Sequence, residues 1–219
     1  MLLAKFLDIL FPKSKREEDV YNIATGVHAL TITPQLTETP AGVHVTTLTK
    51  YESKYVREVI HSLKFHNSRE SAKILAHLLN DYLTEYFAEK SIFGIDTNNI
   101  LILPVPISKE RRRARGFNQI ERILRVLVKI NNEYKKNINT TLLVRHRHTT
   151  PQVSLHKHER LGNLKNAFSL TQPKLLQGKL VIIVDDVATT GATLAEISRT
   201  LHSAKSAHTE AELLALAGA

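Results

Sequence analysis

Cysteine and tryptophan are absent from this 219-residue chain. Without thiolates, neither a disulfide nor a cysteine-based zinc site can form. Chains without cysteine are typical of reducing compartments, so we expect a cytoplasmic protein. No apolar run approaches the roughly 18 residues that a membrane-spanning helix needs, and we expect no span. Lys5 and Asp8 interrupt the apolar stretch 2–11, which favours a short helix over a signal sequence.

Glycine and aromatic residues are also scarce. None of the 8 glycines lies in a G-x-x-x-x-G-K-[ST] pattern, so a P-loop nucleotide site is excluded. Aromatic residues make up only 6% of the chain, which weakens the case for a base-stacking surface.

Positive charge, in contrast, is abundant. The formal net charge is +9, and Lys109–Arg115 alone holds four arginines and one lysine. More cations follow in 145–160. Such a surplus suits a plain soluble surface, a ligand that carries pyrophosphate, or the backbone of a nucleic acid, and charge alone does not separate these.

The stretch Val181–Leu194, VIIVDDVATTGATL, is the most informative part of the sequence. The apolar residues 181–184 predict a strand that is buried on both faces, as in a parallel sheet. Asp185 and Asp186 follow directly, then a turn rich in Thr and Gly over 188–193, then a helical pattern from Leu194. Open α/β sheets bind ligands beyond the carboxyl ends of their strands.

The turn has the chemistry of a phosphate site. Gly191 lets the backbone approach a ligand closely, and free N–H groups at the start of a helix suit an anion. Asp185 and Asp186 would repel phosphate, but they can accept hydrogen bonds from sugar hydroxyls or hold Mg²⁺ through water. The pattern therefore favours a binding site for a phosphorylated ribose over a solvent-exposed Asp-Asp turn without a ligand.

The same motif resembles the phosphoribosyl diphosphate (PRPP) signature of type I phosphoribosyltransferases, and the chain resembles the ComF family more closely. Three further blocks carry the resemblance: YESKYVREVIHSLKF at 51–65, LPVPISKERRRARGFNQ at 103–119 and RHRHTTPQVSLHKHERLGNLKNAF at 145–168. It spans roughly residues 45–217. The family's usual N-terminal zinc module with paired cysteines has no counterpart in residues 1–50.

The resemblance implies an α/β protein with the type I phosphoribosyltransferase fold, a parallel sheet flanked by helices and a small N-terminal β-rich hood. It divides the chain into a helix and β-hairpin part, 1–50, and a phosphoribosyltransferase-like domain, 51–219. The segment 145–168 corresponds to a flap over PRPP. Its paired H-x-H motifs favour solvated histidines over a metal site.

Site residues follow from the same resemblance. The residues expected to be catalytic are Asp185, Asp186, Lys64 and Arg145. Those expected to bind PRPP are Asp185, Asp186, Ala188, Thr189, Thr190, Gly191, Ala192 and Thr193. Those expected to bind pyrophosphate are Val105, Arg111, Arg115 and Arg147. Mg²⁺ is the expected cofactor, held indirectly by Asp185 and Asp186.

Periodicity predicts the remaining elements. Helices are expected over 51–65, 68–87 and 118–130, and strands over 100–103 and 142–144. The tail Glu210–Ala217 has strong helix propensity, but its position after a strand and a helix favours another parallel strand.

Three functions remain open. The first is transfer of a 5-phosphoribosyl group from PRPP to an unidentified acceptor with release of pyrophosphate. The second is a non-catalytic role in competence and DNA uptake with binding of single-stranded DNA. The third is a regulator that senses PRPP. A homodimer is also left open.

Overall fold

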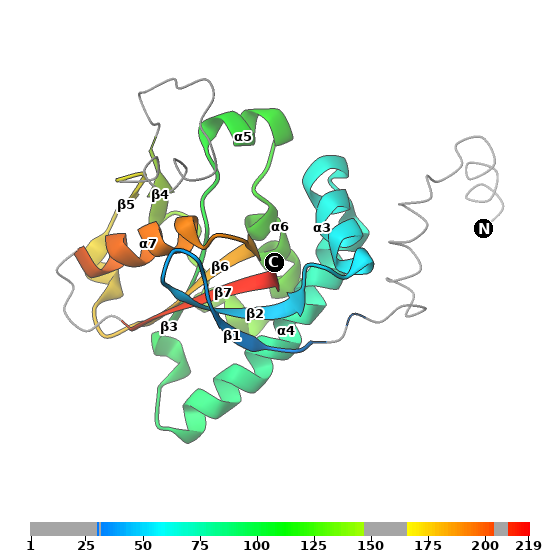
Figure 1. Cartoon of the computed structure of the whole chain (residues 1–219). Coiled ribbons are helices and arrows are strands. Elements are labelled where there is room, and N and C mark those ends of the chain that lie inside the picture. Colours follow the sequence, from blue (N-terminus) through cyan, green and yellow to red (C-terminus); the bar gives the residue numbers. More distant parts are fainter. Residues whose placement is uncertain (1–29, 31, 147–165, 204–209) are drawn as a thin grey trace, which may run out of the picture.

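The computed structural model describes residues 30, 32–146, 166–203 and 210–219. It has an α/β fold in which a mostly parallel sheet is flanked by five helices (Figure 1). The strands are β1 (Gln35–Glu38), β2 (His44–Lys50), β3 (Ile100–Pro104), β4 (Leu143–Arg145), β5 (Phe168–Leu170), β6 (Leu180–Ala188) and β7 (Glu210–Gly218). The helices are α3 (Lys54–His66), α4 (Arg69–Ile92), α5 (Lys109–Arg115), α6 (Gln119–Ile130) and α7 (Ala192–Ser203). Short 3₁₀ turns cover Thr97–Asn99, Asn132–Lys136 and Pro173–Leu176.

The main sheet has the strand order β1-β2-β7-β6-β3. Strands β2, β7, β6 and β3 run parallel, and β1 pairs antiparallel with β2 as a hairpin. The tail is therefore a strand, as its position predicts, and it lies at the centre of the sheet. Strands β4 and β5 form a separate antiparallel ribbon.

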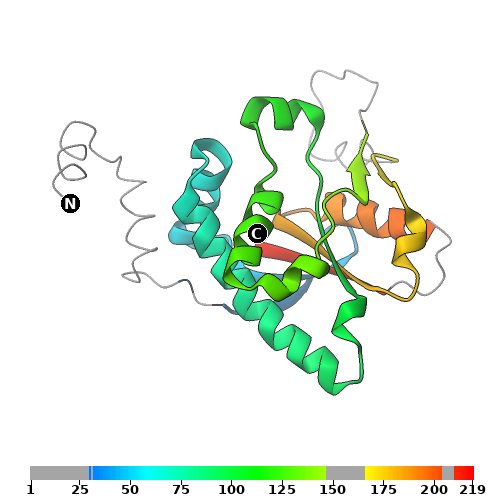
Figure 2. The ribbon, with the colours of Figure 1, turned by 180° about the vertical axis from the view of Figure 1, so that it is seen from behind.

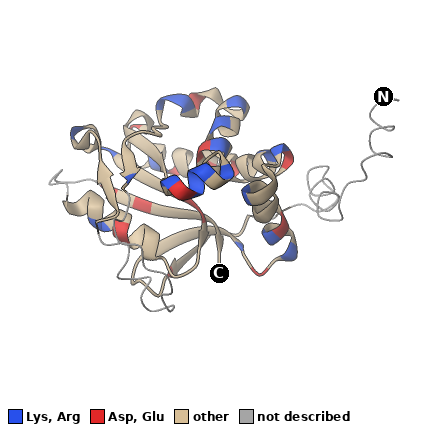
Figure 3. Ribbon diagram, turned by 90° about the horizontal axis from the view of Figure 1, so that it is seen from above, with Lys and Arg blue, Asp and Glu red and all other residues tan. Residues whose placement is uncertain are grey.

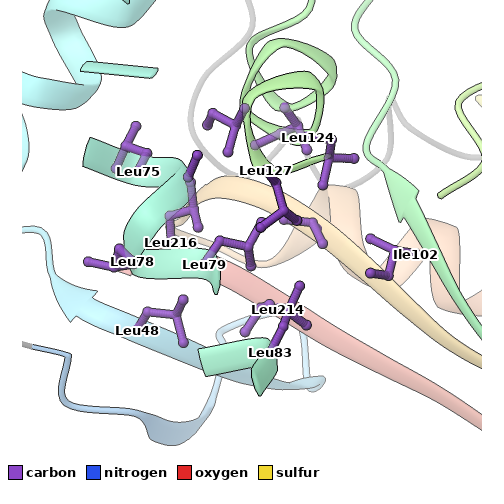
Figure 4. Close-up of a cluster of buried hydrophobic side chains, with 14 of the residues drawn as sticks. Leu48, Leu75, Leu78, Leu79, Leu83, Ile102, Leu124, Leu127, Leu214 and Leu216 are labelled. Atoms are coloured by element: carbon purple, nitrogen blue, oxygen red, sulfur yellow. The ribbon is translucent and has the colours of Figure 1, made fainter. Parts of the chain in front are cut away.

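The strand β6 separates two hydrophobic cores, because successive side chains of a strand point to opposite faces. Ile182 and Val184 face the core formed with α3, α4 and α6, part of which is drawn in Figure 4. Val181 and Ile183 face the core formed with α7 and the β4–β5 ribbon. All four side chains are buried, which confirms the predicted strand. Figure 2 shows α4 and α6 from the side opposite α7.

The helices α3 and α6 begin and end within three residues of the predicted positions, whereas α4 runs five residues beyond its predicted end at residue 87. Two of these helices have clear start signals. Ser68 caps α4 by accepting a hydrogen bond from the N–H of Ser71, and Asn118 caps α6 in the same manner. Capping side chains satisfy N–H groups that the first turn leaves without a partner. The apolar stripes of α3, α4 and α6 then pack on the sheet.

The strand β6 is longer than its apolar stretch, which corrects the prediction of a turn that begins at Ala188. Asp185, Val187 and Ala188 stay in register with Ala215, Ala217 and Gly218 of β7. The neighbour β7 thus carries the strand four residues beyond Val184, and the turn shortens to residues 189–191 before α7 begins at Ala192.

The hairpin expected in residues 20–50 is present as β1 and β2 and is part of the main sheet. The division of the chain at residue 50 stays a prediction, and the sheet includes strands from both sides of it. The helix expected over 2–11 and most of the segment 145–168 lie outside the described residues. Among the helices that the structure describes, none is long and apolar enough to cross a membrane.

Candidate phosphate and ribose site

Asp186 and Lys64 meet at the carboxyl end of β6. The Nζ atom of Lys64, in the last turn of α3, lies 3.0 Å from Asp186 Oδ1. Both side chains keep partial exposure, 21% for Lys64 and 17% for Asp186, so the ion pair is open to a ligand. These two residues lie 122 positions apart in the sequence, and the structure brings them together.

Asp185 has a different environment. Protein atoms surround its carboxylate closely, although the residue as a whole keeps some exposure to solvent. Burial, followed by the charge of Asp186, raises the pKa of Asp185, which is about 7 in the folded protein. The N–H of Asp186 donates to Asp185 Oδ1 over 2.8 Å and opposes that rise, as do the charges of Lys64 and Arg111.

Three arginines add positive charge to the same place. Ser108 caps α5, whose seven residues include no buried side chain. Arg111 and Arg113 are exposed, whereas Arg112 pairs with Glu121 of α6. Burial lowers the pKa of Arg115, Arg111 lowers it further, and Asp186 raises it. Burial and Arg111 also lower the pKa of Arg145, whereas Asp185 raises it. Arg111, Arg115, Arg145 and Lys64 thus share one electrostatic neighbourhood with the two carboxylates. Figure 3 marks the Lys and Arg positions of the described chain in blue and the Asp and Glu positions in red.

Arg145 reaches this neighbourhood from the β4–β5 ribbon. Its guanidinium lies 5.3 Å from the centre of the Phe168 ring, its partner across the ribbon. The ribbon is anchored on α7 through Glu196, which accepts a hydrogen bond from the N–H of Asn166 over 2.5 Å and pairs with Arg199. No sequence pattern predicted this anchor. The Glu196 and Arg199 spacing of three residues was its only local signal.

The Thr-Gly turn is held by the β1–β2 hairpin. Gly191 has a φ of +73°, and a Cβ atom at that position would lie 2.1 Å from Thr39 Oγ1. The N–H of Ala41 donates to the carbonyl of Thr190 over 3.0 Å. Glycine is therefore required twice here, for its backbone conformation and for the close approach of Thr39. No local pattern in 39–41 indicates this long-range contact.

The remaining residues of the motif lie around this turn. Ala188 is buried at the end of β6, Thr189 is exposed, and Ala192 and Thr193 open α7 with partial exposure. A cavity of about 310 Å³ lies between the turn and the hairpin. Four threonines of the hairpin line it together with Thr189: Thr37, Thr39, Thr47 and Thr49.

Val105, which follows β3, uses both of its backbone polar groups inside the fold. Its N–H donates to the carbonyl of Val184 over 2.9 Å, and its carbonyl accepts from Asn118 Nδ2 over 2.9 Å. Its predicted contact with pyrophosphate stays a prediction. Arg147 lies outside the described residues.

The arrangement combines an anion site with two carboxylates. Cations from α3, α5 and β4 surround Asp185 and Asp186, and the start of α7 lies one short turn away. Two adjacent carboxylates fit Mg²⁺, which commonly takes one or two carboxylates together with substrate phosphates. Within the described ranges, no group of three or more His, Asp or Glu side chains converges as a metal site. Mg²⁺ would thus depend on ligand oxygens and water.

The chain is similar to proteins of DNA use and competence. It is 36% identical over 144 residues to the DNA utilization protein YhgH of Escherichia coli O157:H7, covering 65% of this chain and 59% of that protein. It is 41% identical over 101 residues to competence protein F of Haemophilus influenzae, covering 46% and 43%. It is 29% identical over 126 residues to competence protein ComFC of Bacillus subtilis, covering 58% and 48%.

The chain spans about three fifths of the length of YhgH and less than half of the other two proteins. No family model matches it. The absence of a zinc module stays a prediction, since residues 1–29 lie outside the part that the structure describes. The similarity to three differently named competence and DNA utilization proteins, on an α/β fold, supports the resemblance of the chain to the ComF family.

Proposed function

We propose that this protein binds PRPP, or a ligand with the same phosphorylated ribose and pyrophosphate groups, as part of DNA utilization. The observation that carries the proposal is the gathering of Lys64, Arg111, Arg115 and Arg145 around the carboxylates of Asp185 and Asp186. A pyrophosphate needs several cations, whereas ribose hydroxyls need acceptors. Both sets are present at one strand end.

Each part of the ligand has a matching group. The 5′-phosphate would bind at the turn 189–191 and the first turn of α7, where N–H groups have no partner within the helix. The ribose hydroxyls would donate to Asp185 and Asp186. The pyrophosphate would lie toward the arginines of α5 and Arg145, whose planar guanidinium groups suit phosphate oxygens.

Transfer of the phosphoribosyl group is the reaction that this placement suits. The bond between ribose C1 and the pyrophosphate oxygen would break with its electron pair leaving on pyrophosphate, while an acceptor nucleophile forms the new bond to C1. Mg²⁺, when bound, would neutralise charge on the leaving group. Lys64 and the arginines would supply the remaining stabilisation, and the carboxylates would hold the sugar in position.

Calorimetry tests this proposal. Asp186→Asn should weaken PRPP binding about 10- to 100-fold, because hydrogen bonds to a charged acceptor are worth about 1.5–3 kcal/mol. Inorganic pyrophosphate should bind the same variant as tightly as the wild type or more tightly, because a negative charge is gone. Asp81→Asn, at an exposed carboxylate on α4, is the control for net charge. Absence of PRPP binding to the wild type would refute the proposal.

Release of pyrophosphate separates an enzyme from a sensor. A transferase should release it from PRPP when purines, pyrimidines or amines are supplied in turn. Binding without release under every condition would favour a regulator that senses PRPP.

Single-stranded DNA binding is the second candidate function. It is supported by the exposed arginines of α5 and by the names of the similar proteins. Phosphate contacts release counterions, so the affinity should fall steeply as salt rises. Arg113→Ala, at an exposed arginine of α5, should lower that slope by about one. A flat salt dependence would argue against contact with the DNA backbone.

A further inference from the structure

Phe65 is an exposed aromatic residue at the end of α3. Its side chain is 61% exposed, although large apolar side chains on a helix usually pack inward. The neighbouring apolar residues of the same helix do pack inward, with Leu63 at 1% exposure. The Phe65 side chain therefore does not pack in the hydrophobic core.

Other groups organise the Phe65 ring. The guanidinium of Arg115, from α5, lies 5.4 Å from the ring centre. The His61 ring, one turn earlier on α3, has its centre 4.5 Å away at a tilt of 40°. His66 lies beyond it, 5.8 Å from His61. These contacts hold the ring in place between two helices while most of its surface stays open to solvent.

The ring also lies beside the candidate site. Lys64, the preceding residue, forms the ion pair with Asp186. The negative charge of the same carboxylate also acts on Arg115, where it raises the pKa of the guanidinium. The cations of α5 continue away from it along residues 109–113. An aromatic face next to a line of cations is the arrangement that single-stranded nucleic acids bind, with a base on the ring and phosphates on the cations.

We propose that Phe65, held by Arg115, is a stacking platform for a base of single-stranded DNA whose phosphates follow the arginines of α5. The inference depends on the second candidate function, because it names the group that would hold the base. The low aromatic content of the chain does not argue against this contact, because one exposed ring beside cations is enough to stack one base.

The absence of tryptophan gives a direct test, since a single introduced indole reports on its own surroundings. Phe65→Trp should retain DNA binding, and its fluorescence should be quenched by a dT15 strand. An abasic strand of the same length and charge should cause little quenching. Phe93→Trp is the matched control, because Phe93 is 74% exposed and follows the end of α4, away from the arginines of α5 (Figure 1).

Affinity completes the test. Phe65→Leu should weaken binding of dT15 by about 5- to 150-fold, the usual range for one stacked base. Its salt dependence and its affinity for the abasic strand should stay those of the wild type, as should its melting temperature. Phe93→Leu should behave as the wild type with both strands.

The outcomes distinguish the two proposals. If the wild type binds both strands equally and Phe65→Leu changes neither, backbone binding stands and the stacking inference falls. If the wild type binds neither strand, single-stranded DNA binding itself fails and the inference fails with it. The stacking inference would also be overturned if Phe65→Leu weakened the binding of PRPP and left the binding of both DNA strands unchanged.

Discussion

Asp185 and Asp186 are neighbours in sequence but differ in what surrounds their charge. Lys64 balances Asp186 directly, whereas burial and the charge of Asp186 act together on Asp185. A buried carboxylate with a raised pKa next to a paired one is an arrangement found at functional sites, because the protein gives up stability to hold the charges in place.

This cost can be measured through pH. The pKa of Asp185 is raised from 3.8 to about 7 in the folded protein. Between these values the folded state keeps a proton that the unfolded state has lost, so stability falls as the pH rises through this range. Asp185→Asn removes the cost. Its free energy of unfolding, relative to the wild type, should increase from about pH 4 to pH 8, by at most about 1.4 kcal/mol per pH unit.

Urea denaturation at several pH values provides the measurement, with Asp81→Asn as the control for the change in net charge. A difference between Asp185→Asn and the wild type that stays constant across this range would show that Asp185 titrates normally in the folded state.

Gly191 gives a second prediction for a single residue. Gly191→Ala must accept a φ of +73° and a Cβ atom within 2.1 Å of Thr39 Oγ1. Gly178 has a similar φ of +66°, but a Cβ atom there meets nothing within 4 Å. Gly178→Ala should therefore cost only the conformational strain of about 1–2 kcal/mol, and Gly191→Ala should cost clearly more. Equal melting temperatures of the two variants would refute the close contact between hairpin and turn.

At the scale of elements, α6 is tied to the end of β3 by one side chain. Asn118 Oδ1 accepts from the N–H groups of Ile120 and Glu121, while its Nδ2 donates to the carbonyl of Val105. The same residue thus caps the helix and fixes the segment that leads into α5, where the arginines of the site begin.

Two substitutions separate these roles. Asn118→Asp keeps the capping oxygen and loses the donor to Val105, whereas Asn118→Ala loses both. Asn118→Asp also places a carboxylate oxygen against the Val105 carbonyl at a buried position, so we expect both variants to be less stable than the wild type, Asn118→Ala by at least the roughly 1 kcal/mol of a lost cap. Both variants should weaken PRPP binding if the tether positions the arginines. Normal binding by Asn118→Asp would show that the tether serves stability alone.

For the whole molecule, sequence patterns predicted the helices α3, α4 and α6 and the strand β3, because periodicity is a local signal. They did not predict the length of β6, since Asp185 and Asp186 end its apolar run and only pairing with β7 continues the strand. The contact of Thr39 with Gly191 and the anchor of Asn166 on Glu196 were also missed. Each joins segments that are distant in sequence, and nothing in either segment indicates its partner.

The strand β7 holds the two halves of the main sheet together. Strand β7 lies between β2 and β6, and it is the link through which the β1–β2 hairpin joins the rest of the sheet. Its residues Leu214–Ala217 are buried on both faces. A chain that ends at residue 209 should lose cooperative unfolding, because both neighbours of β7 lose their hydrogen-bond partners and the two cores open.

Deletion of Ala219 alone is the control, since it removes one hydrogen bond to the carbonyl of Ala188 and leaves β7 intact. Circular dichroism during heating measures both chains. The control should melt in one sharp transition, and the chain ending at 209 should show none. A sharp transition in the shorter chain would mean that β2 and β6 are held without β7. The hairpin would then be an independent unit, as the predicted boundary at residue 50 implies, and its contact with the Gly191 turn would have to form without the shared sheet.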